Sequence, residues 1–173
     1  MEIMLRDVAL ANSLGARGVV TGALQLNATI DVKSVRILVS AAKPLPVTFH
    51  RAFDYTSNRA ESLEQLIDAG VARVLTSAGA NTALEGAAGI AALVRQARGR
   101  IVVVAGGGIR ENNVRQVVAL TGVNEIHARI GSIVGGAADG PAKIKLRKRL
   151  PDDESAWEEL DEGRMRDLVQ QAG

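Results

Sequence analysis

The stretch Pro46-Val-Thr-Phe-His-Arg-Ala-Phe-Asp54 joins a short apolar strand pattern to a histidine, an arginine and an aspartate at its end. It belongs to a series of five apolar runs, which open at Gly18, Pro46, Arg73, Arg100 and Asn124, at intervals of 28, 27, 27 and 24 residues. An interval of this size holds one strand, one helix and two short connections. The series therefore predicts repeated βα units, with parallel strands covered by helices.

Helical patterns fill the intervals. The predicted helices span about residues 2–14, 31–42, 58–69, 82–97 and 111–121. Asp31 and Asn58 stand at N-cap positions, and Gly70, Gly99 and Gly122 stand where three of the helices should end. The fold class is α/β with about five parallel strands. Since a complete β/α barrel needs eight strands, the sheet is either open or part of an incomplete barrel.

Composition favours one domain and excludes several classes of partner. The 173 residues are 47% hydrophobic, which is enough for a sizeable core, and no apolar run approaches a membrane span. A net charge of +2 and 2% aromatic residues argue against nucleic acid as a partner. The chain has no cysteine, so disulfides, thiolate metal sites and cysteine nucleophiles are excluded. We expect a soluble cytoplasmic protein without a targeting segment.

The composition changes after Gly140. A basic stretch at 143–149 precedes acidic stretches at 152–154 and 158–162, and a terminal helix is predicted near 163–171. We assign residues 1–136 to a partial β/α barrel domain and 137–173 to a charged C-terminal tail whose helix packs on the same domain. A solvated tail is the simplest interpretation, and a nuclear or anion-binding patch is the alternative.

Four motifs follow one another in register: Pro46 to Asp54, Leu75-Thr-Ser77, Thr82-Ala-Leu-Glu-Gly86 and Gly106-Gly-Gly-Ile109. Through them the chain resembles the CutC family of copper homeostasis proteins over about residues 2–131. The resemblance implies a TIM-type β/α barrel. It aligns Met1 with the helix after the family's third strand, so we expect the first three βα units to be missing or partial and the barrel to be incomplete.

Copper is the cofactor that the resemblance implies. The cysteines proposed as copper ligands in some members belong to the part of the barrel that has no counterpart here. None of the residues present replaces a thiolate for Cu(I), so copper binding cannot be carried over from the family by residue matching.

Two histidines are the candidate catalytic residues. Alternation along a strand places Thr48 and His50 on one face, while Glu125 and His127 share a face of the last strand. Barrel active sites lie at the C-terminal ends of the strands, and histidine titrates near neutral pH. His50 equally suits a hydrogen-bonded residue that holds the strand end. As an alternative, His50 and His127 would form a metal site, with Glu125 or Asp54 as the third ligand.

Four further polar residues at strand ends are candidates for ligand binding: Arg51, Asp54, Thr76 and Ser77. Arg51 suits a bidentate grip on an anion, and it equally suits a structural clamp with Asp54. For Asp54 considered alone, a structural role is the favoured interpretation. Thr76 ends its strand and would add a hydroxyl to the same mouth.

A glycine run follows the fourth apolar strand. Gly106, Gly107 and Gly108 would let backbone N–H groups face a phosphate or carboxylate, or they merely permit a tight turn. Gly131-Ser132 would supply the other half of such a site. Nearby, Thr82 and Glu85 have capping-box spacing; the alternative makes Glu85 an acid or base in the pocket.

Three functions remain open at this stage. The first is copper homeostasis of the CutC type, with a pocket at the C-terminal mouth for a small anionic or phosphorylated ligand. The second is a barrel enzyme of the lyase or isomerase type that uses histidine as acid or base. The third is an inactive truncated fragment that needs a partner, because a homo-oligomer or a covering chain would have to protect the open sheet edge.

Overall fold

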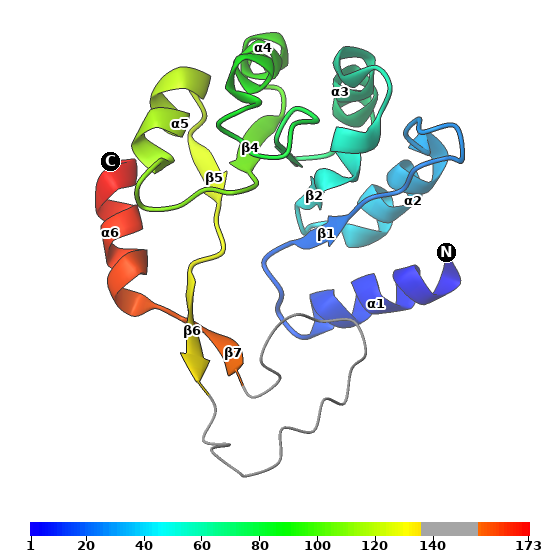
Figure 1. Ribbon diagram of the computed structural model, residues 1–173. Coiled ribbons are helices and arrows are strands. Elements are labelled where there is room, and N and C mark those ends of the chain that lie inside the picture. The colour runs from blue at the N-terminus through cyan, green and yellow to red at the C-terminus, as the bar shows by residue number, and fades with distance from the viewer. Residues whose placement is uncertain (136–155) are drawn as a thin grey trace, which may run out of the picture.

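Five parallel strands form the centre of the molecule. The computed structural model describes residues 1–135 and 156–173. The strands are β1 (Val19–Thr21), β2 (Val47–Phe49), β3 (Arg73–Thr76), β4 (Val102–Gly106) and β5 (Glu125–His127), hydrogen-bonded in the order β1-β2-β3-β4-β5. Every neighbouring pair is parallel, as the repeat predicts. Figure 1 shows the strands arranged as a fan, with the helices along its outer side.

The covering helices follow the predicted alternation. They are α1 (Glu2–Ser13), α2 (Val32–Ala42), α3 (Arg59–Asp68), α4 (Ala87–Ala97) and α5 (Val114–Thr121). The side chains of Asp31 and Asn58 accept hydrogen bonds from the backbone N–H groups three residues later, so both predicted N-caps are confirmed. Gly70, Gly99 and Gly122 have φ of +82°, +75° and +70°, which glycine adopts at helix ends with little strain.

Two predicted helix starts are wrong, because side chains close separate turns before each helix. Thr82 and Glu85 exchange hydrogen bonds between their side chains and backbone N–H groups, and α4 begins only after Gly86. The Asn113 side chain accepts from the N–H of Arg110 and donates to the carbonyl of Gly108, and α5 follows it. The predicted capping pair is therefore present, but it shapes a turn.

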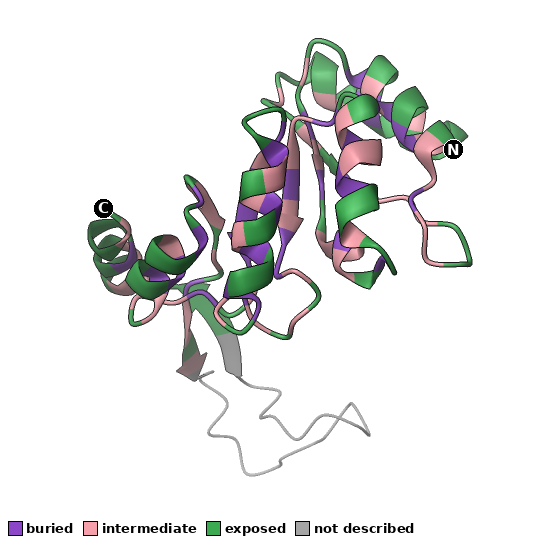
Figure 2. Cartoon of the chain, turned by 90° about the horizontal axis from the view of Figure 1, so that it is seen from above, coloured by how far each residue is buried: buried purple, intermediate pink, exposed green. Residues whose placement is uncertain are grey.

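The hydrophobic core lies between the sheet and the helices. Phe49, Val74, Leu63 and Ile90 are fully buried there. Figure 2 shows buried residues on the strands and on the helices that cover them. The opposite, concave face of the sheet is more open: Val20 is 67% exposed, and an ion pair joins Arg73 to Glu125 across β4. One face of the sheet is thus packed, whereas the other is partly solvated.

The C-terminal part adds a strand pair that the sequence pattern did not predict. Strands β6 (Gly131–Gly135) and β7 (Ala156–Leu160) pair antiparallel, and helix α6 (Glu162–Ala172), close to the predicted terminal helix, lies beside α5 (Figure 1). Arg164 donates to Glu111 at 2.7 Å and to the carbonyl of Gly131 at 2.7 Å. The basic stretch at 143–149 lies outside the described residues.

Within the described ranges, no helix has the length and apolar character needed to span a bilayer.

Candidate functional site

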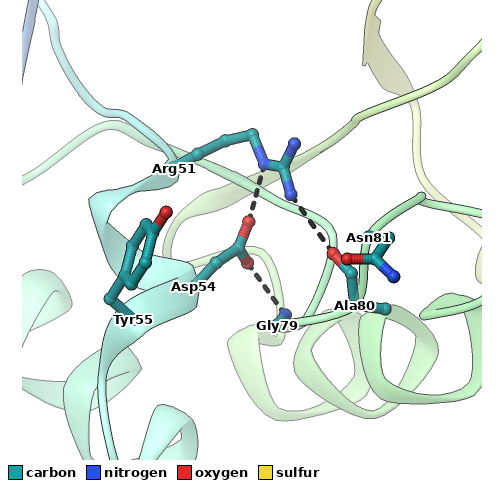
Figure 3. A pocket seen from close by; sticks show the side chains of 6 residues that line it. All are labelled: Arg51, Asp54, Tyr55, Gly79, Ala80 and Asn81. Carbon is teal, nitrogen blue, oxygen red and sulfur yellow. Dashed lines mark hydrogen bonds and ion pairs between the residues drawn. The ribbon is translucent and has the colours of Figure 1, made fainter.

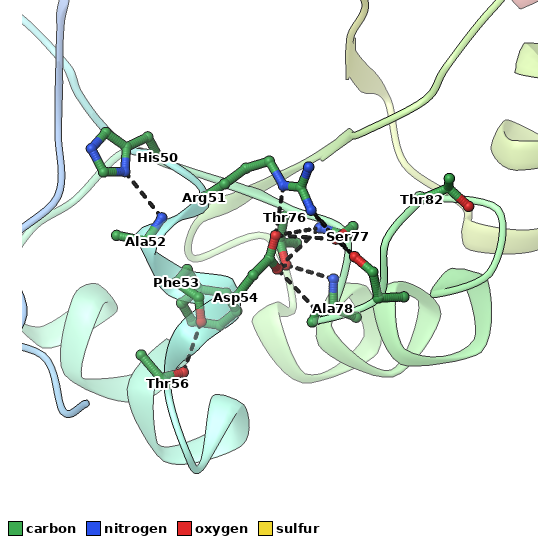
Figure 4. A network of polar contacts seen from close by, with 12 residues as sticks. His50, Arg51, Ala52, Phe53, Asp54, Thr56, Thr76, Ser77, Ala78 and Thr82 are labelled. Atoms are coloured by element: carbon green, nitrogen blue, oxygen red, sulfur yellow. Dashed lines mark hydrogen bonds and ion pairs between the residues drawn. The ribbon is translucent and has the colours of Figure 1, made fainter. Parts of the chain in front are cut away.

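A short 3₁₀ helix turns the chain at the end of β2. This helix, η1 (Arg51–Tyr55), begins after His50, whose Nδ1 accepts a hydrogen bond from the N–H of Ala52 at 3.0 Å. Phe53 is fully buried and fixes η1 against the core. The turn directs Arg51 and Asp54 toward the end of β3, as Figure 4 shows.

Asp54 is the centre of a polar network between the ends of β2 and β3. Its side chain is only 7% exposed. One carboxylate oxygen accepts from the hydroxyl of Thr76 at 2.5 Å and from the N–H of Gly79 at 3.0 Å. The other accepts from Nε of Arg51 at 2.7 Å, and the N–H of Ser77 lies within 3.2 Å of both oxygens. The buried carboxylate is therefore well supplied with donors.

These contacts control the charge of Asp54. Burial alone raises the pKa of the carboxyl, because it disfavours the charged form. The hydrogen bonds from Thr76, Arg51, Ser77 and Gly79 outweigh burial and hold the pKa below its ordinary value. Asp54 is thus a carboxylate at neutral pH, and its charge faces the Arg51 guanidinium.

Hydrogen bonds hold two nitrogens of the Arg51 guanidinium, Nε and Nη2. Besides Nε, which donates to Asp54, its Nη2 donates to the hydroxyl of Ser77 at 2.5 Å and to the carbonyl of Ala80 at 3.3 Å. Within the described part of the chain, no hydrogen bond uses Nη1. Figure 3 shows this nitrogen directed away from Asp54 and Ala80, and the side chain is 40% exposed. Arg51 combines the clamp with a guanidinium edge that remains able to bind an anion.

The glycine run lies against the same arginine. Gly107 and Gly108 take φ of +111° and +66°, and a Cβ on Gly107 would come within 2.9 Å of Nη1 of Arg51. The carbonyl of Gly107 accepts from the N–H of Ala83 at 2.8 Å, and a Cβ on Gly108 would meet Thr82 at 3.0 Å. The β4–α5 and β3–α4 loops are therefore joined, and glycine lets the backbone approach Arg51 closely.

A pocket of about 470 Å³ opens beside this network (Figure 3). Its lining consists of Arg51, Asp54, Tyr55, Gly79, Ala80 and Asn81. Four of these residues were not among the sequence candidates, since they lie in η1 and in the loop after β3, where no periodic pattern exists. The one available signal was position, because the loop directly follows Thr76 and Ser77.

The two histidines do not join this site. A Cβ on Gly22 would come within 2.2 Å of the His50 ring, so this ring lies against Gly22, just after the end of β1. Figure 4 shows the ring directed away from Asp54. His127 is exposed at the end of β5, beside Gly106. Two strands separate β2 from β5, which places the strands roughly 14 Å apart along the sheet. The predicted pairing of His50 with His127 is not assembled.

The sequence offers no thiolate site for copper. Thiolates are preferred ligands of Cu(I), and the sequence contains no cysteine. Among the residues that the structure describes, no group of three His, Cys, Asp or Glu side chains lies close enough to hold a metal ion. Neither Glu125, which pairs with Arg73, nor Asp54, which is saturated with donors, is available as the third ligand beside a histidine.

Comparisons with known proteins agree on one family. The family model described as the CutC family matches residues 1–132. The chain is 41% identical over 157 residues to a family protein CutC of Histophilus somni, covering 91% of this chain and 65% of that relative. It is 48% identical over 127 residues to a family protein CutC of Glaesserella parasuis, covering 73% and 52%. The chain thus spans between about half and two thirds of the length of these relatives.

Solved structures support the same fold. The CutC protein of Streptococcus agalactiae, provisionally assigned to copper homeostasis, superimposes with a TM-score of 0.69 and 34% identity, over 73% of this chain and 62% of that one. Mandelate oxidase, a TIM-barrel enzyme, gives a TM-score of 0.52 at 21% identity, over 72% of this chain and 43% of that one. The second likeness concerns the fold alone. Together they confirm the prediction of an incomplete barrel of the TIM type.

Proposed function

The chain belongs to the CutC family, and from this premise we propose that it serves copper homeostasis by binding a small anionic ligand at the mouth formed by the ends of β2 and β3. The ligand class is a phosphate or a carboxylate. The role in copper homeostasis comes from the naming of the Streptococcus agalactiae relative, whereas the ligand class comes from the pocket.

The observation that carries the ligand class is the state of Arg51. Its Nε and Nη2 are fixed by Asp54, Ser77 and Ala80, while Nη1 has no hydrogen-bond partner among the described residues. Arg51 also lines the pocket of about 470 Å³. Holding a guanidinium in one orientation reduces the entropy that it loses when a ligand binds. The pocket also presents Asn81, whose amide can donate a second hydrogen bond.

The charge of Asp54 does not oppose this ligand strongly. The carboxylate lines the same pocket, but its oxygens already accept from Arg51, Thr76 and Gly79. Its function is to orient the guanidinium. Because the arrangement contains no metal ligand set, the proposed contribution to copper homeostasis runs through the anion and involves no copper coordination by the described residues.

Acid–base catalysis by histidine gains no support from these contacts. His50 uses Nδ1 to hold η1, and neither histidine lines the pocket beside Arg51. The anion-binding function is therefore the one that the site favours.

Calorimetric titration with inorganic phosphate tests the proposal. We expect saturable binding by the wild-type chain and a loss of about tenfold in affinity in Arg51→Lys, because lysine keeps the charge but cannot donate to Asp54, Ser77 and a ligand from one plane. The variant His127→Ala is the control and should bind phosphate like the wild type, because His127 does not line the pocket. A parallel titration with Cu(I) should give no saturable binding.

Two results would contradict the proposal. Equal phosphate affinity in the wild type and Arg51→Lys would remove Arg51 from the site. A loss of binding in His127→Ala, with its fold intact by circular dichroism, would move the site toward the end of β5.

A further inference from the structure

Tyr55 is a large aromatic side chain that the fold leaves in solvent. It is the single tyrosine of the chain, and it is 79% exposed. Among the residues that the structure describes, its hydroxyl has no hydrogen-bond partner and its ring contacts no other aromatic ring. Isolated exposed apolar side chains are common on protein surfaces. Tyr55 differs from the other exposed ones because it lines the pocket beside Arg51.

The backbone on either side of Tyr55 is anchored. Phe53 is fully buried, and Thr56 is 2% exposed. The hydroxyl of Thr56 donates to the carbonyl of Phe53 at 2.8 Å, and the N–H of Thr56 donates to the same carbonyl at 3.1 Å. The ring therefore extends from a fixed turn, and a ligand that covers it restricts little beyond the two side-chain torsions of the tyrosine.

The loop after β3 forms the other wall of the pocket. Gly79 and Ala80 leave this wall without bulky side chains. Figure 3 shows Tyr55 and Asn81 on opposite sides of Asp54. Within the described part of the chain, the amide of Asn81 makes no hydrogen bond, so it remains able to donate to a ligand. The pocket thus joins an aromatic face on one side to a free polar group on the other.

The pocket is larger than the anion that Arg51 would bind. Its volume of about 470 Å³ lies within the range of about 300–1,000 Å³ that is typical of sites for small organic molecules. Inorganic phosphate beside Arg51 would fill only a part of this space and would leave the Tyr55 ring in water. A ligand that carries both an anionic group and a planar apolar group would occupy both parts.

We propose that the ligand of this pocket is an aromatic anion, in which the phosphate or carboxylate is bonded to a planar ring. The anionic group binds Arg51, and the ring packs on Tyr55 in the offset or edge-to-face arrangement that aromatic pairs prefer. Asn81 donates a further hydrogen bond from the opposite wall. This inference rests on the proposed anion-binding function and adds the kind of group that the anion carries. Tyr55 is then the residue that selects it.

Calorimetric titration with two phosphate monoesters separates the ring from the anion. At about pH 8 phenyl phosphate and methyl phosphate are both almost fully dianionic, because the second pKa of such esters is about 6. We expect the wild-type chain to bind phenyl phosphate about fivefold more tightly, the effect of one aromatic pair. Tyr55→Phe keeps the ring and should keep this preference. Tyr55→Ala should bring the ratio of the two affinities to about one, whereas the control His127→Ala should leave the ratio unchanged.

The ring signals of Tyr55 in nuclear magnetic resonance give a second measurement that needs no variant, because the chain has a single tyrosine. Phenyl phosphate should shift these signals saturably, and methyl phosphate should shift them much less. Unshifted signals at saturating phenyl phosphate would overturn the ring contact.

The failure of this inference differs from the failure of the proposed function. If Arg51→Lys weakens both esters but the wild type binds them equally, or if the preference survives in Tyr55→Ala, anion binding stands and the ring contact is overturned. If the wild type binds neither ester, the proposed anion-binding function fails, and this inference fails with it.

Discussion

His50 and Asp54 leave the same end of β2, yet they enter different surroundings. Asp54 lies between the ends of β2 and β3, where it is 7% exposed and accepts from Arg51, Thr76 and two backbone N–H groups. His50 points away from Asp54, is exposed, and makes one local hydrogen bond. The difference teaches that burial and the supply of partners determine which residues of a motif build the site. The chemical reactivity of the residue type does not.

Removing the Asp54 carboxylate is the strongest way to break this contrast. Asp54→Ala leaves the donors of Thr76, Ser77 and Gly79 without an acceptor and Arg51 without a counter-charge. We expect a loss of about 3 kcal/mol in the free energy of unfolding, at the lower end for a broken buried pair because Arg51 is 40% exposed. Urea unfolding measures it. A loss below about 0.5 kcal/mol, the range of ordinary surface changes, would show that the network does not hold the site.

Gly86→Ala should disturb the same network through the backbone of Ser77. A Cβ at Gly86 would lie 1.9 Å from the carbonyl oxygen of Ser77, so the turn before α4 must move. The φ of −86° is accessible to alanine, and the expected loss of about 1–3 kcal/mol comes from the clash alone. The control is Gly163→Ala in α6, where the added Cβ would have no contact closer than 3.4 Å and should not destabilise the chain. Unchanged thermal stability in Gly86→Ala would mean that the loop is looser than its contacts imply.

The dependence of stability on acidic pH tests the contribution of the Asp54 charge. The pKa of Asp54 is lowered in the folded state, so its stabilising contribution is present above the unfolded pKa of about 3.9 and is lost as pH falls through the folded value. Asp54→Asn should therefore show a shallower loss of stability on acidification. Arg100 lowers the pKa of Glu64 to about 2, so this residue also stabilises the fold less as the pH falls. Its contribution should be the same in the wild type and in Asp54→Asn. If the free energy of unfolding falls equally steeply with pH in the wild type and in Asp54→Asn, Asp54 does not have a lowered pKa in the folded state.

The histidines should give the smallest effects. His50→Ala removes the acceptor for the N–H of Ala52, at a cost of about 1 kcal/mol, comparable to a lost helix cap. His127→Ala should change stability by less than about 0.5 kcal/mol, since the residue is exposed. Urea unfolding of both variants gives the comparison. If His127→Ala costs as much as Asp54→Ala, the concave face carries structure that these contacts do not reveal.

The strand–helix alternation was readable from the sequence because it depends on local rules. Asp31 and Asn58 cap helices through their own neighbours, and Gly70 and Gly122 end helices through their own φ. The antiparallel pair β6–β7 was not readable, since its strands lie more than 20 residues apart and pair through non-local contacts such as Ser132 opposite Glu159.

The candidate site was predictable only in part. Arg51, Asp54, Thr76 and Ser77 were selected because parallel strands bring their C-terminal ends together, and the structure joins all four. The direction of each side chain could not be predicted, because η1 rotates the chain after His50 out of the strand alternation. This rotation separates Asp54 from His50 and creates the pocket wall at Tyr55.

The most direct test of the account is a phosphate titration followed by nuclear magnetic resonance of side-chain nitrogens. It observes Nε of Arg51 and the ring nitrogens of His50 and His127 in one sample. The account predicts saturable shifts of the Arg51 signal and of the Gly79 amide, with both histidine rings unchanged at constant pH. Shifts confined to the histidine rings would contradict it and would place the ligand on the concave face.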